Sequence, residues 1–316
     1  MKIISWYLTS VLLALNAHAA PLAKFMGANA AVPEVVVVKR VGEQDVKLEY
    51  FRPAAITKGE RRPAIVWIHG GAWVAGTAEA TTPPARYFAE RGMFSANIVY
   101  RLASPGKVTV GDCLADCRAA MRYLRVNAAD LGIDPERIAV AGDSAGGHLA
   151  AALGTLPDED TMCRPNAMLL YNPIVDMTEG DRIRYAVGGE ALANKKSPRP
   201  TAPEEVALAR SLSPLFHVRA GQVPSIVLHG RADSVVPVSQ AERFAAASRA
   251  IGSRCDLVIY EDNIGHAFVI AGYKAPEPVV VEAIRAGDRF LVSLGWLKGD
   301  PDLTVSSPPA WPSRTP

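Results

Sequence analysis

The segment Val140–His148, which reads VAGDSAGGH, constrains the fold of this chain more than any other. Ile138 to Ala141 is an apolar run typical of a strand, and a helix-forming stretch begins at His148. Ser144 lies between them with a glycine two residues away on either side, which is the G-x-S-x-G pattern of a nucleophile elbow. A sharp strand-to-helix turn strains the serine and leaves no room for flanking side chains. The segment therefore predicts a nucleophilic Ser144 at the end of a strand.

A serine hydroxyl is a weak nucleophile unless a base takes its proton, so the elbow predicts a histidine and an acid elsewhere. We expect His266 to be the base, because a loop after the last predicted strand can return over the elbow. Asp233 follows the preceding strand and gives the order Ser–Asp–His expected of an α/β-hydrolase. Asp176, which also lies beyond a strand end, is the alternative acid.

Backbone N–H groups must also be available for the oxyanion that forms during acyl transfer. The N–H of Ala145 is one candidate, because it follows the nucleophile directly. Gly70 and Gly71 are two more, since they follow the buried apolar run 64–68 and allow close approach of the backbone. The neighbouring Trp73 is expected to line the substrate pocket, with an ordinary core tryptophan as the alternative.

Strands alternate with helices along the chain, which predicts an α/β fold with a mostly parallel sheet covered on both faces. The predicted α/β-hydrolase domain spans residues 20–299. Residues 176–222, rich in Gly, Pro, Arg and Lys, interrupt the alternation and are expected to form a lid or cap. The Pro/Ser-rich residues 300–316 are expected to be disordered.

The first nineteen residues resemble a secretory signal. Lys2 is followed by the mostly apolar stretch 3–15 and by the pattern Ala-His-Ala, which ends at Ala19. We therefore expect residues 1–19 to be removed and the protein to be periplasmic or secreted, with an uncleaved anchor as the alternative. No other apolar run is long enough to cross a membrane.

Charge and cysteine content narrow the possible partners. The 34 basic and 32 acidic residues nearly balance, and the sequence has no long basic run. We therefore expect no binding to nucleic acid. Cys113 and Cys117 are poorly placed to bridge each other, but either could pair with Cys163 or Cys255, or all four could stay reduced. The cysteines lack a histidine at ligand spacing, so we expect no metal site.

Several motifs together resemble those of bacterial carboxylesterases similar to hormone-sensitive lipase, especially exported members like acetyl esterases and feruloyl esterases. The motifs are HGGAW at 69–73, YRLA at 100–103, GDSAGG at 142–147, DSVVP at 233–237 and GHAF at 265–268. The resemblance extends from about residue 35 to residue 297. It implies that Ser144, Asp233 and His266 are the catalytic triad and that Gly70, Gly71 and Ala145 supply the oxyanion hole.

The resemblance also implies cofactor-free hydrolysis of short acyl esters through an acyl-enzyme. We expect an acetyl or similar ester as substrate, either a small molecule or an ester on plant polysaccharide. A serine peptidase on the same fold and a catalytically silent binding protein are the alternatives.

One departure from the motifs is Ala72, which replaces a third glycine. If this position has a positive φ, alanine there carries strain of about 1 kcal/mol.

Overall fold

The computed structural model describes residues 20–307 apart from residues 27–29, 54–56, 58, 195 and 262. The predicted signal segment, 1–19, and the end of the predicted tail, 308–316, lie outside the described residues.

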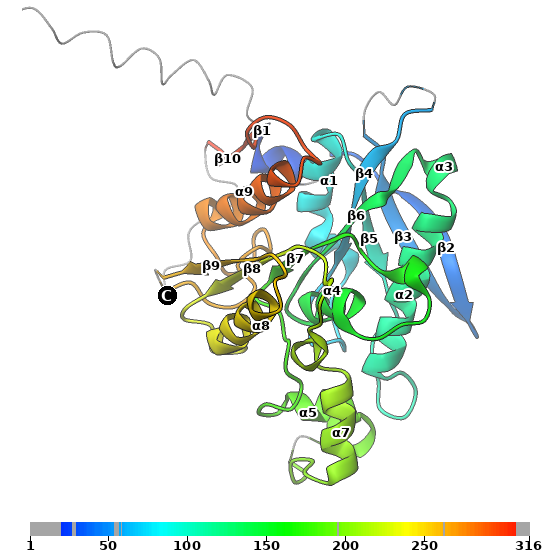
Figure 1. Ribbon diagram of the computed structural model, residues 1–316, viewed down its shortest axis with the longest axis vertical. Coiled ribbons are helices and arrows are strands. Elements are labelled where there is room, and N and C mark those ends of the chain that lie inside the picture. Colours follow the sequence, from blue (N-terminus) through cyan, green and yellow to red (C-terminus); the bar gives the residue numbers. More distant parts are fainter. Residues whose placement is uncertain are drawn as a thin grey trace, which may run out of the picture.

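An eight-stranded sheet with the order β2-β3-β5-β4-β6-β7-β8-β9 forms the centre of the protein (Figure 1). Strand β3 runs antiparallel to both of its neighbours, and all pairs from β5 to β9 are parallel. This architecture confirms the predicted α/β-hydrolase fold. The strands are β2 (Glu34–Val41), β3 (Gln44–Phe51), β4 (Arg62–Ile68), β5 (Phe94–Val99), β6 (Ile133–Asp143), β7 (Ala167–Tyr171), β8 (Ser225–Gly230) and β9 (Cys255–Tyr260).

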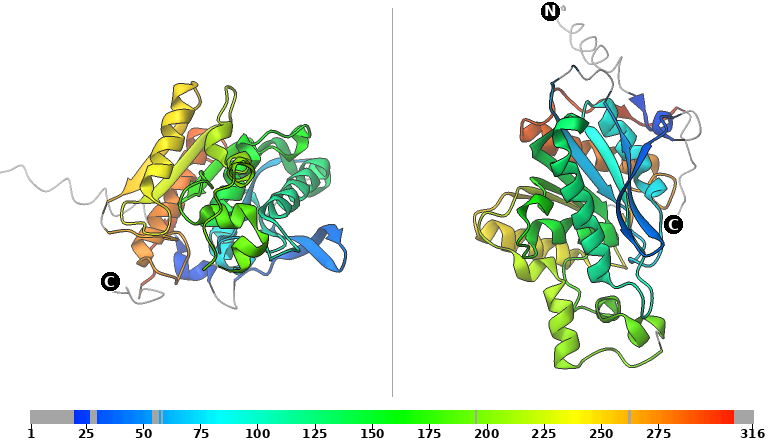
Figure 2. Two further views of the ribbon diagram at one scale, coloured as in Figure 1. Left: turned by 90° about the horizontal axis from the view of Figure 1, so that it is seen from below. Right: turned by 90° about the vertical axis from the view of Figure 1, so that its right-hand side faces the viewer.

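Helices cover both faces of this sheet (Figure 2). Helices α2, α4 and α8 bury their apolar side chains against one face, and α1 and α9 bury theirs against the other. The helices are α1 (Thr82–Glu90), α2 (Val110–Val126), α3 (Ala128–Leu131), α4 (Ser144–Thr155), α5 (Arg182–Val187), α6 (Gly189–Ala193), α7 (Pro203–Ser211), α8 (Val238–Ala250) and α9 (Glu277–Ser293).

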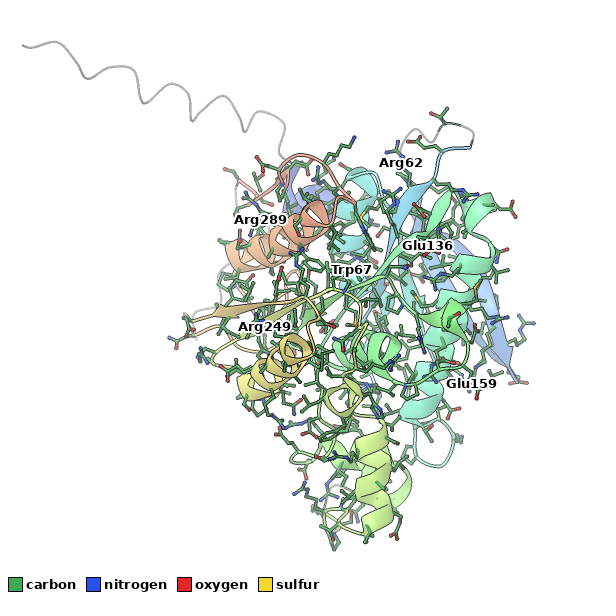
Figure 3. The ribbon with its side chains drawn as sticks, in the orientation of Figure 1. Arg62, Trp67, Glu136, Glu159, Arg249 and Arg289 are labelled. Atoms are coloured by element: carbon green, nitrogen blue, oxygen red, sulfur yellow. The ribbon has the colours of Figure 1, made fainter. Side chains whose placement is uncertain are left out.

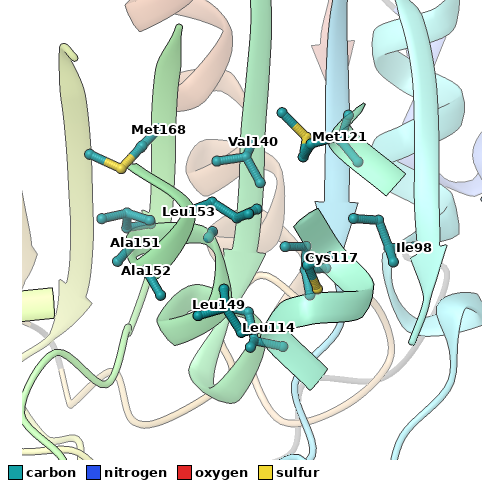
Figure 4. Close-up of a cluster of buried hydrophobic side chains, with 14 of the residues drawn as sticks. Ile98, Leu114, Cys117, Met121, Val140, Leu149, Ala151, Ala152, Leu153 and Met168 are labelled. Carbon is teal, nitrogen blue, oxygen red and sulfur yellow. The ribbon is translucent and has the colours of Figure 1, made fainter. Parts of the chain in front are cut away.

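Strand β4 shows why the central strands are apolar along their whole length. Its side chains alternate between the two cores, so both faces must be hydrophobic. Trp67 lies in the interior on the α9 side, stacked on Tyr171 (Figure 3). On the opposite side of the sheet, Val140 of β6 faces side chains of α4 and α2, including Leu149 and Leu114 (Figure 4).

The two ends of the described chain meet. β1 (Ala20–Pro21) pairs in parallel with β10 (Leu303–Thr304), and the short 3₁₀ helix η1 (Leu22–Phe25) packs beside them. Leu22 and Leu303 are both completely buried. The predicted disorder of residues 300–316 is therefore wrong for 300–307, because one buried leucine and strand pairing fix this stretch.

Residues 176–222, which we call the cap, connect β7 to β8 and contain α5, α6 and α7. Helices α5 and α7 pack together and project beyond the end of the sheet (Figures 1 and 2). Two parts of the cap are joined to each other where the N–H of Met177 donates to Ser213 Oγ at 2.7 Å. The cap leaves the sheet at the carboxyl end of β7, the edge at which ligands bind in such folds.

The four cysteines are free thiols and all are buried, which corresponds to the reduced alternative. No helix in the described part of the chain is long and apolar enough to cross a membrane. Within residues 20–307, gaps excepted, no three His, Cys, Asp or Glu side chains gather in a way that could hold a metal ion.

Candidate active site

The nucleophile elbow has the strand–turn–helix geometry that its sequence predicts. Strand β6 ends at Asp143, helix α4 begins at Ser144, and the serine has a φ of 52°. A Cβ at Gly142 would lie 2.4 Å from the carbonyl oxygen of Gly146, and a Cβ at Gly146 would lie 2.0 Å from that of Ile68. Glycine is thus required at both positions to let the strained turn pack against β4.

The structure brings Ser144, His266 and Asp233 together. His266 Nε2 lies 2.7 Å from Ser144 Oγ, and His266 Nδ1 lies 2.7 Å from Asp233 Oδ2. An ionised carboxylate only accepts hydrogen bonds, so Nδ1 carries the proton and Nε2 is free to accept from the serine hydroxyl. The alternative acid, Asp176, instead pairs with Arg243 at 3.1 Å.

Asp233 is held by four hydrogen bonds. Its Oδ1 accepts the N–H groups of Val235 and Val236, each at 2.8 Å. Its Oδ2 accepts from His266 and also lies 3.2 Å from His229 Nε2. Burial would raise the pKa of Asp233, but the hydrogen bonds from His229, His266 and Val236 hold it well below its usual range. The carboxylate therefore stays ionised and can stabilise an imidazolium at His266.

The HGGAW loop at residues 69–73, which we call the oxyanion loop, differs in one respect from the prediction. The N–H of Gly70 donates to Asp143 Oδ1 at 2.9 Å, so this group is already used, and its assignment as an oxyanion donor is corrected. The N–H groups of Gly71, Ala72 and Ala145 have no hydrogen-bond partner among the residues that the structure describes. Gly71 and Ala145, with Ala72 beside them, are thus the available donors. Ala145 also lies at the N-terminus of α4, where the helix dipole favours negative charge.

The loop conformation explains why its glycines cannot be replaced freely. Gly71 has a φ of 112°, and a Cβ there would lie 2.2 Å from the carbonyl oxygen of Ala75. Ala72 has a φ of 52°, so the conditional prediction of strain at this position applies. Trp73 follows with a φ of 62°. Two consecutive residues with side chains thus occupy the left-handed region, which persists only where surrounding contacts impose it.

Trp73 is not placed to line a substrate pocket. Only 1% of it is exposed, and its ring lies edge-on to His148 and against Tyr185 of the cap. The expectation that this side chain faces substrate is therefore corrected to a buried, hydrogen-bonded tryptophan.

The sequence analysis gave neither His148 nor His229 a part in the site. The signal available for His148 is its position one helical turn after Ser144.

Asp143 lies in an unusual electrostatic position, since it is buried directly before the nucleophile. Burial raises the pKa of Asp143 to about 6, against the opposing effects of the Gly70 N–H and of the nearby His266 ring. The carboxylate couples the end of β6 to the oxyanion loop, a contact between elements that the sequence alone does not reveal.

The fold and this arrangement of serine, histidine and aspartate define an α/β-hydrolase. A protein-family model described as BD-FAE matches residues 49–247, which is more than half of the chain. The chain therefore belongs to the BD-FAE family. The predicted relationship to α/β-hydrolase esterases is confirmed at this level.

Similar proteins are esterases. The chain is 29% identical over 281 residues to esterase LipQ of Mycobacterium tuberculosis, covering 85% of this chain but 65% of LipQ, slightly less than two thirds. A propionate-bound structure of the thermophilic esterase Est2 from Thermogutta terrifontis is 34% identical, with a TM-score of 0.73. That match covers 85% of this chain and 96% of Est2. The butyrate-bound Est2 structure is 35% identical with a TM-score of 0.74, covering 84% and 96%.

Proposed function

We propose that the protein is an exported serine carboxylesterase that hydrolyses short-chain acyl esters. The observation that carries this proposal is the hydrogen-bonded series Asp233–His266–Ser144, with both links at 2.7 Å. Beside it lie the backbone N–H groups of Gly71 and Ala145, which have no hydrogen-bond partner among the described residues. The bound propionate and butyrate of the Est2 structures support short acyl chains.

In the acylation step, Ser144 Oγ attacks the ester carbonyl carbon while His266 Nε2 takes the hydroxyl proton. The carbonyl oxygen becomes an oxyanion that accepts hydrogen bonds from Gly71 and Ala145. His266 then gives its proton to the alcohol oxygen, the bond from carbon to that oxygen breaks, and the alcohol leaves. The acyl group remains bonded to Ser144.

In the deacylation step, His266 Nε2 takes a proton from water, whose oxygen attacks the acyl carbon. The second tetrahedral oxyanion uses the same N–H donors. The bond to Ser144 Oγ then breaks, and the serine recovers its proton from His266. Asp233 stays ionised throughout, holding Nδ1–H and compensating the positive charge on the ring.

The finer part of the proposal concerns location and substrate. The predicted cleavage site ends at Ala19, and β1 begins at Ala20, so removal of residues 1–19 leaves every described element intact. Export places the enzyme with extracellular material, which favours acetyl or related esters on small molecules or on plant polysaccharide, including feruloylated polysaccharide.

The test is hydrolysis of p-nitrophenyl esters from acetate to palmitate, followed by assays for acetate or ferulate released from polysaccharide. We expect kcat/KM to peak between acetate and butyrate, and Ser144→Ala to lower kcat by a factor on the order of 10⁴ or more. Ser95→Ala is the matched control, because the Ser95 hydroxyl is buried and has no partner among the described residues.

A fluorophosphonate should label wild-type protein once, and the labelled peptide should contain Ser144. Folded wild-type protein that hydrolyses no ester would overturn the proposal, as would undiminished activity of Ser144→Ala. Ester hydrolysis without release from polysaccharide would restrict the substrate to small molecules.

A further inference from the structure

Trp73 is held from several sides in spite of its left-handed backbone. Its carbonyl oxygen accepts the N–H of Ala103 at 2.8 Å, and its Nε1–H donates to His148 Nδ1 at 3.2 Å. The indole is almost fully buried and also contacts Tyr185 of α5. These contacts impose the unusual conformation at Ala72 and Trp73, and hence the position of the N–H groups just before them.

The His148 ring uses both of its nitrogen atoms. Its Nε2 lies 2.7 Å from the carbonyl oxygen of Leu212, the residue that follows α7 in the cap. A carbonyl only accepts and an indole N–H only donates, so Nε2 carries the proton and Nδ1 accepts from Trp73. Burial lowers the pKa of His148 to about 4, which keeps the ring neutral near pH 7.

His148 also shares a helix with the nucleophile. It lies four residues after Ser144 in α4, so the two are about one helical turn apart. One ring therefore connects the elbow helix, the oxyanion loop and the end of α7 in the cap.

We propose that His148 is a positioning residue for ester hydrolysis. By holding Trp73, it sets the N–H groups of Gly71 and Ala72 relative to Ser144, and through Leu212 it couples them to the cap. This inference rests on the proposed esterase activity, because the loop matters for turnover only if those N–H groups bind an oxyanion.

The first test, Trp73→Phe, removes the indole N–H together with part of the buried ring, and the control below accounts for the lost volume. We expect kcat for p-nitrophenyl acetate to fall about tenfold while KM changes less than about twofold, since the loop acts on the transition state. Complete loss of a donor typically costs about 10²- to 10³-fold, and a misplaced donor costs less. Affinity for a short alkyl trifluoromethyl ketone, which forms an oxyanion adduct with the serine, should weaken by a similar factor.

Trp67→Phe is the matched control. Trp67 is completely buried in the interior, and its Nε1 has no hydrogen-bond partner among the described residues (Figure 3). The same substitution therefore removes an unused N–H. We expect kcat and the affinity for the ketone to stay within about twofold of wild type, whatever small change in stability occurs.

Two substitutions at His148 test the ring itself. His148→Gln keeps one acceptor and one donor and should retain kcat within about threefold. His148→Met has no donor and only a weakly accepting sulfur, and it should lose about tenfold. If the two residues act as a unit, adding Trp73→Phe to His148→Met should cause little further loss.

All variants are compared well below their unfolding temperatures, so that a stability change alone does not alter kcat. The inference is overturned if Trp73→Phe keeps both kcat and ketone affinity within twofold of wild type, or if its effect and that of His148→Met multiply. Wild-type protein without esterase activity would remove the proposed function and this inference together, whereas an active wild type with an unaffected Trp73→Phe removes the inference alone.

Discussion

Asp143 connects the two loops that form the site, although it is not one of the three triad residues. Its Oδ1 accepts the N–H of Gly70, and a Cβ at Gly70 would lie 2.5 Å from its Oδ2. The oxyanion loop can approach this carboxylate only because Gly70 has no side chain. The contact makes Gly70 an anchor of the loop and leaves the N–H of Gly71 without a hydrogen-bond partner among the described residues.

The raised pKa of Asp143 predicts a pH dependence of stability. The folded protein binds a proton at Asp143 more tightly than the unfolded chain, since burial raises this pKa from 3.8 to about 6. The stabilising contribution is therefore complete below about pH 4 and is lost as the pH rises through about 6, a difference of about 3 kcal/mol. Asp143→Asn keeps an acceptor for Gly70 but does not titrate.

Urea unfolding of both proteins at several pH values checks this prediction. The free energy of unfolding of Asp143→Asn relative to wild type should rise by about 2 kcal/mol between about pH 4 and pH 7, because at pH 4 the unfolded carboxyl is itself partly protonated. His148, whose pKa is lowered to about 4, titrates with the opposite sign in both proteins and cancels in the comparison. A difference between the two proteins that does not vary with pH would contradict the assignment.

At the scale of elements, the sequence predicts the long buried strands and the elbow well. β4 and β7 are continuous apolar runs because both faces of a parallel strand are buried, and this pattern is visible without a structure. β1 and β10 have two residues each and pair across nearly the whole chain, so no local pattern marks them. The hydrogen bond from the Gly70 N–H to Asp143 could not be predicted from the sequence for the same reason, because it depends on distances between elements.

The pairing of β1 with β10 predicts the effect of shortening the chain. Removal of residues 300–316 exposes Leu22 and deletes the buried Leu303, so we expect the free energy of unfolding to fall by about 2–4 kcal/mol. Removal of 308–316 alone leaves every described contact in place and serves as the control. Urea unfolding that gives the same stability for both truncated proteins would show that β10 contributes nothing.

At the scale of the whole molecule, the burial of the four thiols predicts their redox state in an oxidising compartment. All are buried, and burial raises the pKa of Cys113 and that of Cys163 to about 12. The reactive thiolate form is therefore strongly disfavoured. We expect the folded protein to keep four reduced cysteines even in an oxidising compartment.

One intact-mass measurement of protein recovered from the periplasm or medium of an exporting host checks this prediction and the cleavage site. The mass should correspond to residues 20–316 with four thiols, because each disulfide would lower it by about 2 Da. A lower mass that is restored by reduction would show disulfide formation, and a mass that includes residues 1–19 would contradict cleavage after Ala19.

The meeting of the two chain ends also has a consequence for biosynthesis. The N–H of Ala23 donates to Ser306 Oγ at 2.9 Å, across a separation of 283 residues. The ribosome therefore makes the first of these partners long before the second, and Leu22 lacks the leucine of β10 until residue 303 has been made and released. A nascent chain that stops short of β10 keeps an apolar patch uncovered, which chaperones and proteases can distinguish from the finished molecule.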